Sequence, residues 1–138
     1  EKLDAEKMAV LSALVCDPIP YLEACLFRNE EDLTQNPKEV FESYKISSPP
    51  GPYSFDNRYV TEDVPMGLVL LSSLGEKLGI YTPECNRLID MCGGILARDF
   101  FKEGRTLKAL GLGELTKEEL LHFVEESPVL ERNSGELI

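Results

Sequence analysis

Arg58 and Asp63 are the residues of this chain whose types and spacing best suit chemistry on an anionic substrate. An arginine guanidinium is a rigid fork of donors that binds a carboxylate through two hydrogen bonds. Asp63 follows five residues later, in what we expect to be the first turn of an apolar helix, where the helix dipole favours a negative charge. A loop rich in serine, proline and glycine over residues 47–52 leads into this segment. Loop and helix start together predict a clamp for a carboxylate.

Four side chains near Arg58 are candidates for contact with the same substrate. Tyr59 and Thr61 stand beside it in the sequence and are predicted to bind substrate. Tyr53 and Phe55 lie on the preceding loop, from which aromatic rings could close over a substrate's side chain. Taken one at a time, the arginine and the aspartate also have plain structural explanations, as a solvated cation and as a partner of the helix dipole.

The elements that must position these residues are helices, because helix signals recur along the chain and strand signals are almost absent. Asn36 followed by Pro37 is a helix start, and Thr116 with Glu119 forms a capping box. We therefore predict an all-α domain, a single compact bundle of about six helices around a central apolar helix. The stretches expected to be helical are residues 1–15, 20–26, 37–46, 61–78, 83–96 and 117–126.

The central helix of this bundle is expected over residues 64–78. Thr61 is a suitable N-cap for it, Pro65 falls within its first turn, and Gly79 is placed to end it. Residues 68–78 are apolar on nearly every side, which is typical of a helix that others surround.

The next helix is expected to be capped by Thr82 and Pro83. Glycines at positions 93 and 94 interrupt its apolar pattern, so we expect a close helix crossing or a kink there. The residues expected on its inner side are Cys85, Leu88, Ile89, Cys92, Ile95 and Leu96.

The net charge of −11 argues against nucleic acid as a partner, because phosphate contacts need a basic face. Residues 47–113 carry eight acids against seven bases, so the segment around Arg58 is close to neutral and suits an anionic ligand better than the acidic ends.

No apolar run approaches the ~20 residues that a membrane span needs. Arg98, Lys102, Arg105 and Lys108 form a local basic patch, which we interpret as solvated cations near a helix end rather than a phosphate site.

Four cysteines, at positions 16, 25, 85 and 92, have no Cys-x-x-Cys or Cys/His spacing, so we predict no metal site. We interpret them as buried, reduced thiols of a cytoplasmic protein. The chain opens at Glu1 without a methionine or a secretory segment, which indicates an excised domain rather than a complete gene product.

The run Arg-Tyr-Val-Thr-Glu-Asp-Val-Pro-Met-Gly-Leu, residues 58–68, resembles the signature of the helical, substrate-binding C-terminal domain of the octopine/nopaline (opine) dehydrogenases. Its Arg-x-x-x-x-Asp-x-Pro core carries most of the likeness. Supporting pieces occur in the same order over about residues 3–123: residues 3–7, Thr82 with Pro83, residues 105–107, residues 110–112 and the capping box of residues 115–120.

The resemblance implies an enzyme that condenses an amino acid with a 2-oxo acid and reduces the imine with NAD(P)H to a secondary amine dicarboxylate. Arg58 matches the family arginine that binds a substrate carboxylate. Asp63 matches the carboxylate that pairs with a catalytic histidine, which lies outside this chain. The single histidine, His122, does not match that position, and we interpret it as structural or surface.

The same resemblance divides the whole enzyme into two parts. Residues 1–128 correspond to the substrate-binding and domain- or dimer-packing half, and residues 129–138 form a tail. No Gly-x-Gly-x-x-Gly follows a strand here, so NAD or NADP belongs to a Rossmann domain of the same polypeptide that this chain lacks. The chain alone is therefore expected to bind no cofactor and to be inactive, and the resemblance is compatible with a homodimer.

Two other interpretations stay open at this point. The chain could be a non-catalytic acidic helical module that docks a basic peptide or mediates oligomerisation, with an exposed apolar patch as its working surface. It could also be the helical half of another two-domain dehydrogenase, such as a ketopantoate reductase-like protein, although that enzyme needs a lysine near the substrate and residues 58–63 contain none.

Overall fold

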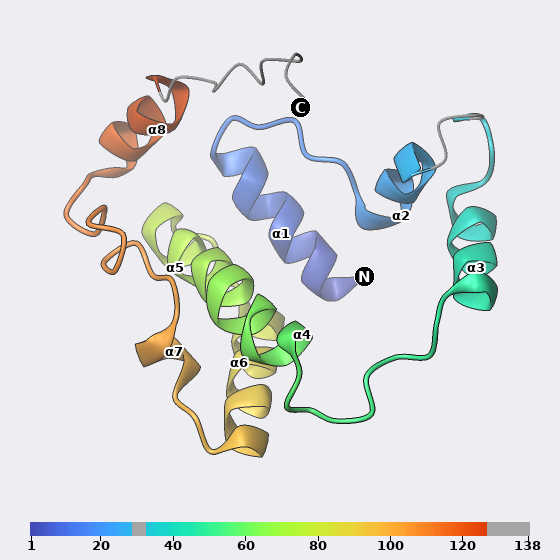
Figure 1. Cartoon of the computed structure of the whole chain (residues 1–138). Helices are drawn as coiled ribbons and strands as arrows, with labels where there is room; N and C mark the ends of the chain where they lie inside the picture. Colours follow the sequence, from blue (N-terminus) through green and yellow to red (C-terminus); the bar gives the residue numbers. More distant parts are fainter. Residues whose placement is uncertain (29–32, 127–138) are drawn as a thin grey trace, which may run out of the picture.

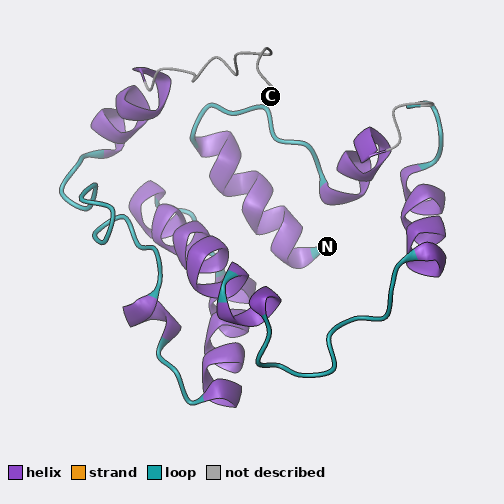
Figure 2. Ribbon diagram, in the orientation of Figure 1, coloured by secondary structure: helices purple, strands orange, loops and turns teal. Residues whose placement is uncertain are grey.

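The computed structural model describes residues 1–28 and 33–126, and every regular element within these residues is helical (Figure 2). The predicted all-α fold is therefore confirmed. A 3-10 helix, Cys25–Arg28, follows α2, and a π-helical segment, Val64–Leu68, joins α4 to α5. The α-helices are α1 (Lys2–Ala13), α2 (Tyr21–Ala24), α3 (Pro37–Ser47), α4 (Arg58–Thr61), α5 (Val69–Leu78), α6 (Pro83–Leu96), α7 (Phe100–Glu103) and α8 (Lys117–Glu126). The expected helix stop after residue 126 and the tail at residues 129–138 lie outside the described residues.

Helix α5 is the element on which its neighbours pack, as expected for the central apolar helix. It contacts α1, α6 and the π-helical segment, and α1 runs alongside it in Figure 1. One group of buried side chains, including Ile89 and Phe100, fills the space where the π-helical segment, α5 and α6 meet. A second group, including Val10 and Leu120, joins α1, α5 and α8. Helix α2, the 3-10 helix and α3 pack on one another.

Several helix ends lie where local sequence signals predict them. The Asn36 Oδ1 atom accepts a hydrogen bond from the Lys38 backbone N–H at 2.9 Å at the start of α3. Thr116 and Glu119 form the predicted capping box before α8, at 2.8 and 3.2 Å. Gly79 ends α5 in the left-handed conformation, with φ 73°. These predictions succeed because each contact joins residues only a few positions apart.

The structure differs from the sequence expectations at one helix end and at two residues that were expected to be buried. Val15 lies beyond the end of α1 at φ 59° and is 72% exposed, because backbone in the left-handed region cannot continue the helix. Val10 occupies the buried position on α1 instead. Ile95 is 47% exposed, whereas Leu96, which was expected on the same side of the helix, packs against the core. Cys16 is exposed, whereas the other three cysteines are buried.

The glycine pair in α6 lies at a close backbone approach near the C-terminal end of that helix. A Cβ atom at Gly93 would lie 2.6 Å from the Arg98 carbonyl oxygen. The chain turns back there because Ala97 takes a left-handed conformation and Arg98 N donates to Gly93 O at 2.9 Å. Gly94 has nothing within 4 Å of such a Cβ, so only the first glycine is required by packing.

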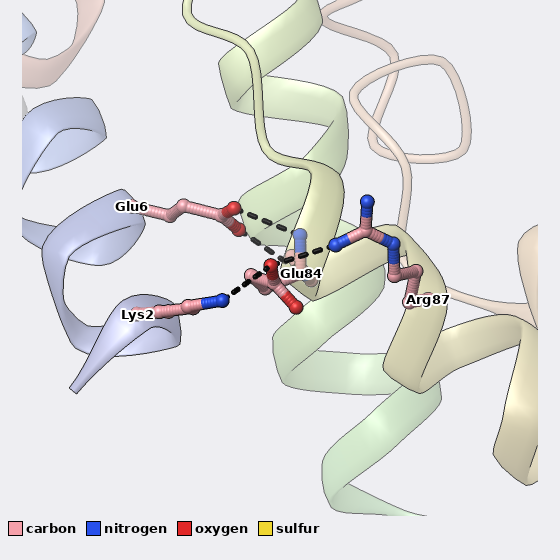
Figure 3. Close-up of polar contacts among 5 residues, drawn as sticks. Lys2, Glu6, Glu84 and Arg87 are labelled. Atoms are coloured by element: carbon pink, nitrogen blue, oxygen red, sulfur yellow. Dashed lines mark hydrogen bonds and ion pairs between the residues drawn. The ribbon is translucent and has the colours of Figure 1, made fainter.

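The N-terminus of α6 is capped from α1 rather than by its own flanking residue (Figure 3). Thr82 occupies the predicted N-cap position but makes no side-chain cap hydrogen bond. Its side chain packs toward Gly75, where a Cβ would lie 2.8 Å from the threonine methyl group. The Glu6 carboxylate instead accepts hydrogen bonds from the backbone N–H groups of Glu84 and Cys85, at 2.8 and 2.9 Å.

A second acid of α1 positions α2. The Asp4 carboxylate accepts a hydrogen bond from the Tyr21 backbone N–H at 3.0 Å and pairs with Lys7 at 2.6 Å. Both contacts lower the pKa of Asp4, the contact with the Lys7 ammonium more than the backbone hydrogen bond. The short segment 3–7 thus carries one carboxylate for α2 and another, Glu6, for α6.

Candidate functional site

The helical backbone that carries the candidate residues begins at Arg58, earlier than expected. Asn57 is the N-cap, and its Oδ1 atom accepts a hydrogen bond from Tyr59 N at 2.9 Å. The prediction of Thr61 as the N-cap is wrong, because Thr61 is the last residue of α4 and its hydroxyl donates to Asn57 O at 3.0 Å. Asp63 therefore follows the first turn rather than lying within it, and the helix dipole no longer accounts for its position.

The early start places Pro65 beyond the first helical turn, where a residue without a backbone N–H disturbs regular α-helical hydrogen bonding. The backbone there adopts the π-helical form over Val64–Leu68. The Pro65 carbonyl accepts a hydrogen bond at 2.8 Å from the backbone N–H of Arg105, which follows α7. Gly104 allows this approach, since a Cβ there would lie 2.6 Å from the Pro65 oxygen. Single π-helical turns inside helices are frequent at functional sites.

Arg58 and Asp63 both have exposed side chains, and the ion-pair partner of Arg58 is Glu62. The Arg58 Nη2 and Glu62 Oε1 atoms are 3.9 Å apart, and the two side chains are 73% and 60% exposed. An exposed ion pair at this distance contributes little to stability, so the guanidinium remains available to an incoming carboxylate. Among the described residues, no hydrogen bond or ion pair joins Arg58 to Asp63.

The loop before α4 lines a small surface cavity of about 240 Å³. Asn57 and Tyr59, the chain neighbours of Arg58, contribute to its lining, whereas Arg58 is not among the lining residues. Tyr53, Phe55 and Tyr59 stand around the cavity and are 94%, 56% and 61% exposed. Val60 forms another wall and packs against the core that includes Ile89 and Phe100. The described residues that line it are Pro52, Tyr53, Ser54, Phe55, Asn57, Tyr59 and Val60.

Hydrogen bonds within the loop maintain this cavity. Asn57 N donates to Phe55 O at 3.0 Å, and Asp56 N donates to Ser54 Oγ at 3.1 Å. The Asn57 side chain also donates to the Ser54 carbonyl oxygen. The segment that carries Tyr53 and Phe55 is therefore a folded turn that ends at the N-cap of α4.

A larger apolar groove of about 650 Å³ lies between α1, α2, α3 and the end of the π-helical segment. Leu3, Tyr21, Phe41, Leu68 and Leu71 supply much of its wall, with charged residues at its edge. The rings of Tyr21 and Phe41 meet edge to face there, with centroids 6.1 Å apart. Arg58 and Asp63 do not line this groove.

Arg98, the first residue of the basic patch after α6, makes contacts with two residues close to it in the sequence. Arg98 pairs with Glu103 at 2.6 Å, and its guanidinium lies 4.8 Å from the centre of the Phe100 ring.

His122 is exposed on α8. The described residues contain no group of three or more histidine, cysteine and acidic side chains that could hold a metal ion. None of their helices is long and apolar enough to cross a membrane.

Two residues of this region were not among the sequence candidates, yet the sequence carries a signal for each. Glu62 follows Arg58 by four positions, the spacing that brings side chains together on one helix face. Asn57 belongs to the residue types that best cap helices, and it precedes α4 directly. Both signals point to an earlier helix start than the one that Thr61 suggests.

Comparison with known proteins gives a consistent result. Residues 1–96 match the profile of the family described as NAD/NADP octopine/nopaline dehydrogenase, alpha-helical domain. The chain is 35% identical over 129 residues to a protein named opine dehydrogenase from Arthrobacter sp. (strain 1C), an alignment that covers 91% of this chain and 35% of the relative. It is 38% identical over 77 residues to vitopine synthase from Allorhizobium ampelinum, covering 55% of this chain and 21% of that protein. The chain thus spans about a third or less of the length of these relatives.

Proposed function

Because the chain belongs to the octopine/nopaline dehydrogenase family, as its alpha-helical domain, we propose that it is the substrate-binding part of an opine dehydrogenase-like oxidoreductase. In that enzyme the amino group of an amino acid condenses with the carbonyl of a 2-oxo acid, water is lost, and reduction of the imine gives a secondary amine dicarboxylate. The observation that carries the proposal is the family match over residues 1–96, which includes the segment around Arg58 and Asp63.

Arg58 binds a substrate carboxylate in this proposal. Its position supports the role, since the guanidinium is exposed and its single ion-pair partner among the described residues, Glu62, is 3.9 Å away. A carboxylate that accepts two charge-assisted hydrogen bonds from the guanidinium can displace so weak a partner. Tyr59 and Thr61 line the same turn, and we assign them supporting contacts with the substrate.

Asp63 orients a histidine that the rest of the polypeptide supplies. Its carboxylate is exposed at the junction between α4 and the π-helical segment, so another domain can reach it. A carboxylate bonded to one imidazole nitrogen keeps the ring in one tautomer and stabilises its protonated form. The histidine can then exchange protons with the reacting amine through its other nitrogen.

The residues of this chain do not fit the dinucleotide cofactor. No Gly-x-Gly-x-x-Gly motif is present, and the glycine-rich residues 111–113 sit between helical segments rather than after a strand. We therefore assign NAD or NADP to a Rossmann domain elsewhere in the whole protein and derive no step through it from this chain. All four cysteines are free thiols rather than disulfide partners, which supports the expected cytoplasmic location.

The test is a comparison of the whole protein with the 138-residue chain. We expect the whole protein to consume NADH or NADPH only when an amino acid and a 2-oxo acid are both present, with one secondary amine dicarboxylate formed per cofactor oxidised. The chain alone should show no turnover. If the whole protein forms no such product with any pair, and the apolar groove between α1 and α3 instead captures a basic peptide, the non-catalytic alternative holds.

A further inference from the structure

The π-helical segment, Val64–Leu68, is held by two contacts from other parts of the fold. The Pro65 carbonyl oxygen accepts a hydrogen bond from the backbone N–H of Arg105 at 2.8 Å. The Leu68 carbonyl oxygen accepts one from the Cys85 thiol at 3.2 Å. Arg105 follows α7, whereas Cys85 lies in α6. A carbonyl group near each end of the segment is therefore fixed to a different neighbouring element.

Gly104 provides the space for the first of these contacts. Its φ of −84° and ψ of 176° are backbone angles that any residue can adopt, so its conformation does not require a glycine. The surrounding atoms do require one, because an added Cβ would lie 2.6 Å from the carbonyl oxygens of both Pro65 and Phe100. It would also lie 2.9 Å from the Val69 side chain. Since Gly104 is buried, a methyl group there has to displace one of these neighbours.

The α7 side of this contact is the better anchored of the two. Phe100 is 1% exposed and belongs to the core where the π-helical segment, α5 and α6 meet. The Asp99 side chain caps α7 by accepting a hydrogen bond from Lys102 N at 3.1 Å. On the other side, Pro65 has no backbone N–H to donate within the helix. We therefore expect the π-helical segment, rather than α7, to move when Gly104 gains a side chain.

Asp63 immediately precedes the π-helical segment and is two residues before Pro65. Each peptide unit between them is planar, so a displacement of Pro65 carries over to Asp63. Arg58 depends less on this contact, because it begins α4 and the Asn57 side chain caps that helix from the loop. A change at Gly104 should therefore reach the carboxylate of Asp63 before it reaches the guanidinium of Arg58.

We propose that Gly104 is a positioning residue for the Asp63 carboxylate, and that Cys85 assists it at the other end of the π-helical segment. The inference rests on the proposed function, in which Asp63 orients a histidine from the rest of the polypeptide. That hydrogen bond forms only over about 2.6 to 3.2 Å between heavy atoms. A displacement of about 1 Å is therefore enough to weaken it, and such displacements can lower a rate about 100-fold.

The experiment uses the whole protein and compares Gly104→Ala with Gly94→Ala. A Cβ added at the exposed Gly94 meets no atom of the described residues outside its own helical backbone within 4 Å, which makes this variant the matched control. Gly104→Ala should lower kcat about 10- to 100-fold and shift the pH profile of kcat/KM as Asp63→Asn does, with KM changed less than about threefold. The control should keep the wild-type values, and circular dichroism verifies that both variants fold.

The double variant shows whether the effect passes through Asp63. Once asparagine has replaced the carboxylate, moving the segment can do little further harm, so Asp63→Asn with Gly104→Ala should have the kcat of Asp63→Asn within about threefold. If the two losses multiply instead, Gly104 acts only on the stability of the fold and the inference is wrong.

Cys85 gives an independent test that does not depend on whether Gly104→Ala folds. Cys85→Ala removes the donor to the Leu68 carbonyl oxygen, whereas Cys85→Ser keeps one. The alanine variant should lower kcat about three- to tenfold and the serine variant should restore most of it, since one hydrogen bond is lost and regained. Where Gly104→Ala fails to fold, equal kcat values in these two variants overturn the inference.

The proposed function and this inference fail in distinguishable ways. If the wild-type protein forms no secondary amine dicarboxylate from any pair of substrates, both fail. If the wild-type protein is active and Asp63→Asn is impaired, but folded Gly104→Ala keeps the wild-type kcat and pH profile, the inference is wrong while the enzyme activity stands. Wild-type behaviour of Asp63→Asn would also overturn the inference, because no carboxylate would then need positioning.

Discussion

Glu6 on α1 binds the backbone N–H of Cys85 on α6 at 2.9 Å, although 79 residues separate them in the sequence. The other oxygen of the same carboxylate binds Glu84 N at 2.8 Å (Figure 3). Two of the unpaired amides at the start of α6 are thereby satisfied by a negative charge at the positive end of the helix dipole. The contact joins α1 and α6, the two helices that pack on α5, and α5 continues directly from the π-helical segment that follows Asp63.

Replacing Glu6 by alanine should lower the free energy of unfolding by about 1 to 3 kcal/mol, because two charge-assisted hydrogen bonds are lost. Urea unfolding of the chain followed by circular dichroism measures this change. Glu84→Gln is the matched control, since it removes only the ion pairs with Lys2 and Arg87 and keeps the backbone amide. The basic partners of these pairs are 82% and 68% exposed, so the control should change the stability by less than about 1 kcal/mol. Equal losses in the two variants would contradict the capping role.

Replacing Arg58 by alanine in the whole protein should raise the KM for a carboxylate substrate about 10- to 100-fold, because charge-assisted hydrogen bonds to the substrate are lost. Arg58→Lys should recover part of the loss, since lysine keeps the charge but not the planar fork. Glu62→Gln is the control: it removes the 3.9 Å partner of Arg58 and should alter the KM by less than about fivefold. Steady-state kinetics with each substrate varied in turn give these values. An unchanged KM in Arg58→Ala refutes the assignment.

Replacing Asp63 by asparagine should act mainly on kcat, with a decrease of about 10²- to 10⁴-fold, because the partner histidine loses the carboxylate that orients it. The pH profile of kcat/KM should also shift, since the carboxylate no longer stabilises the protonated imidazole. Asp56→Asn makes the same change on the neighbouring loop and should leave both quantities close to wild type. A normal pH profile in Asp63→Asn would show that the residue has no part in proton transfer.

Cys85 should be the least reactive thiol of the folded chain and Cys16 the most reactive among the four. Cys85 is fully buried, and burial raises its pKa from 9.0 to about 11, with a smaller contribution from the Glu6 carboxylate. Labelling with iodoacetamide at about pH 8 should therefore modify Cys16 first and leave Cys85 intact until the chain unfolds.

The same pKa predicts how stability changes in alkaline solution. The unfolded chain ionises Cys85 near pH 9.0, whereas the folded chain keeps the proton until about pH 11. Stability should therefore fall as the pH rises through this interval, by up to about 3 kcal/mol, and then level off. Cys85→Ala should remove this part of the pH dependence in urea unfolding measured at several pH values. Identical slopes in the two proteins contradict it.

The sequence was enough to select the candidate residues of the site, but it did not predict where the helix that carries them begins. Residue types, spacing and the likeness of residues 58–68 to the opine dehydrogenases are enough to single out Arg58 and Asp63, and the family match confirms that likeness. The sequence did not show that Asn57 starts the helix, because two adequate capping residues, Asn57 and Thr61, stand four positions apart. Which of the two residues caps the helix depends on how the loop folds against α4.

The all-α class, the caps at Asn36 and Thr116, and the end of α5 at Gly79 follow from the amino-acid sequence alone, because these features depend on contacts within one or two helical turns. Tertiary packing, in contrast, establishes that α6 is capped from α1 and that the Pro65 carbonyl is paired with Arg105. It also makes the aromatic loop enclose a cavity. The first two contacts join segments 40 or more residues apart, and the cavity depends on the folding of its loop. A backbone group left unpaired in one segment finds its partner only after packing has brought the other segment beside it.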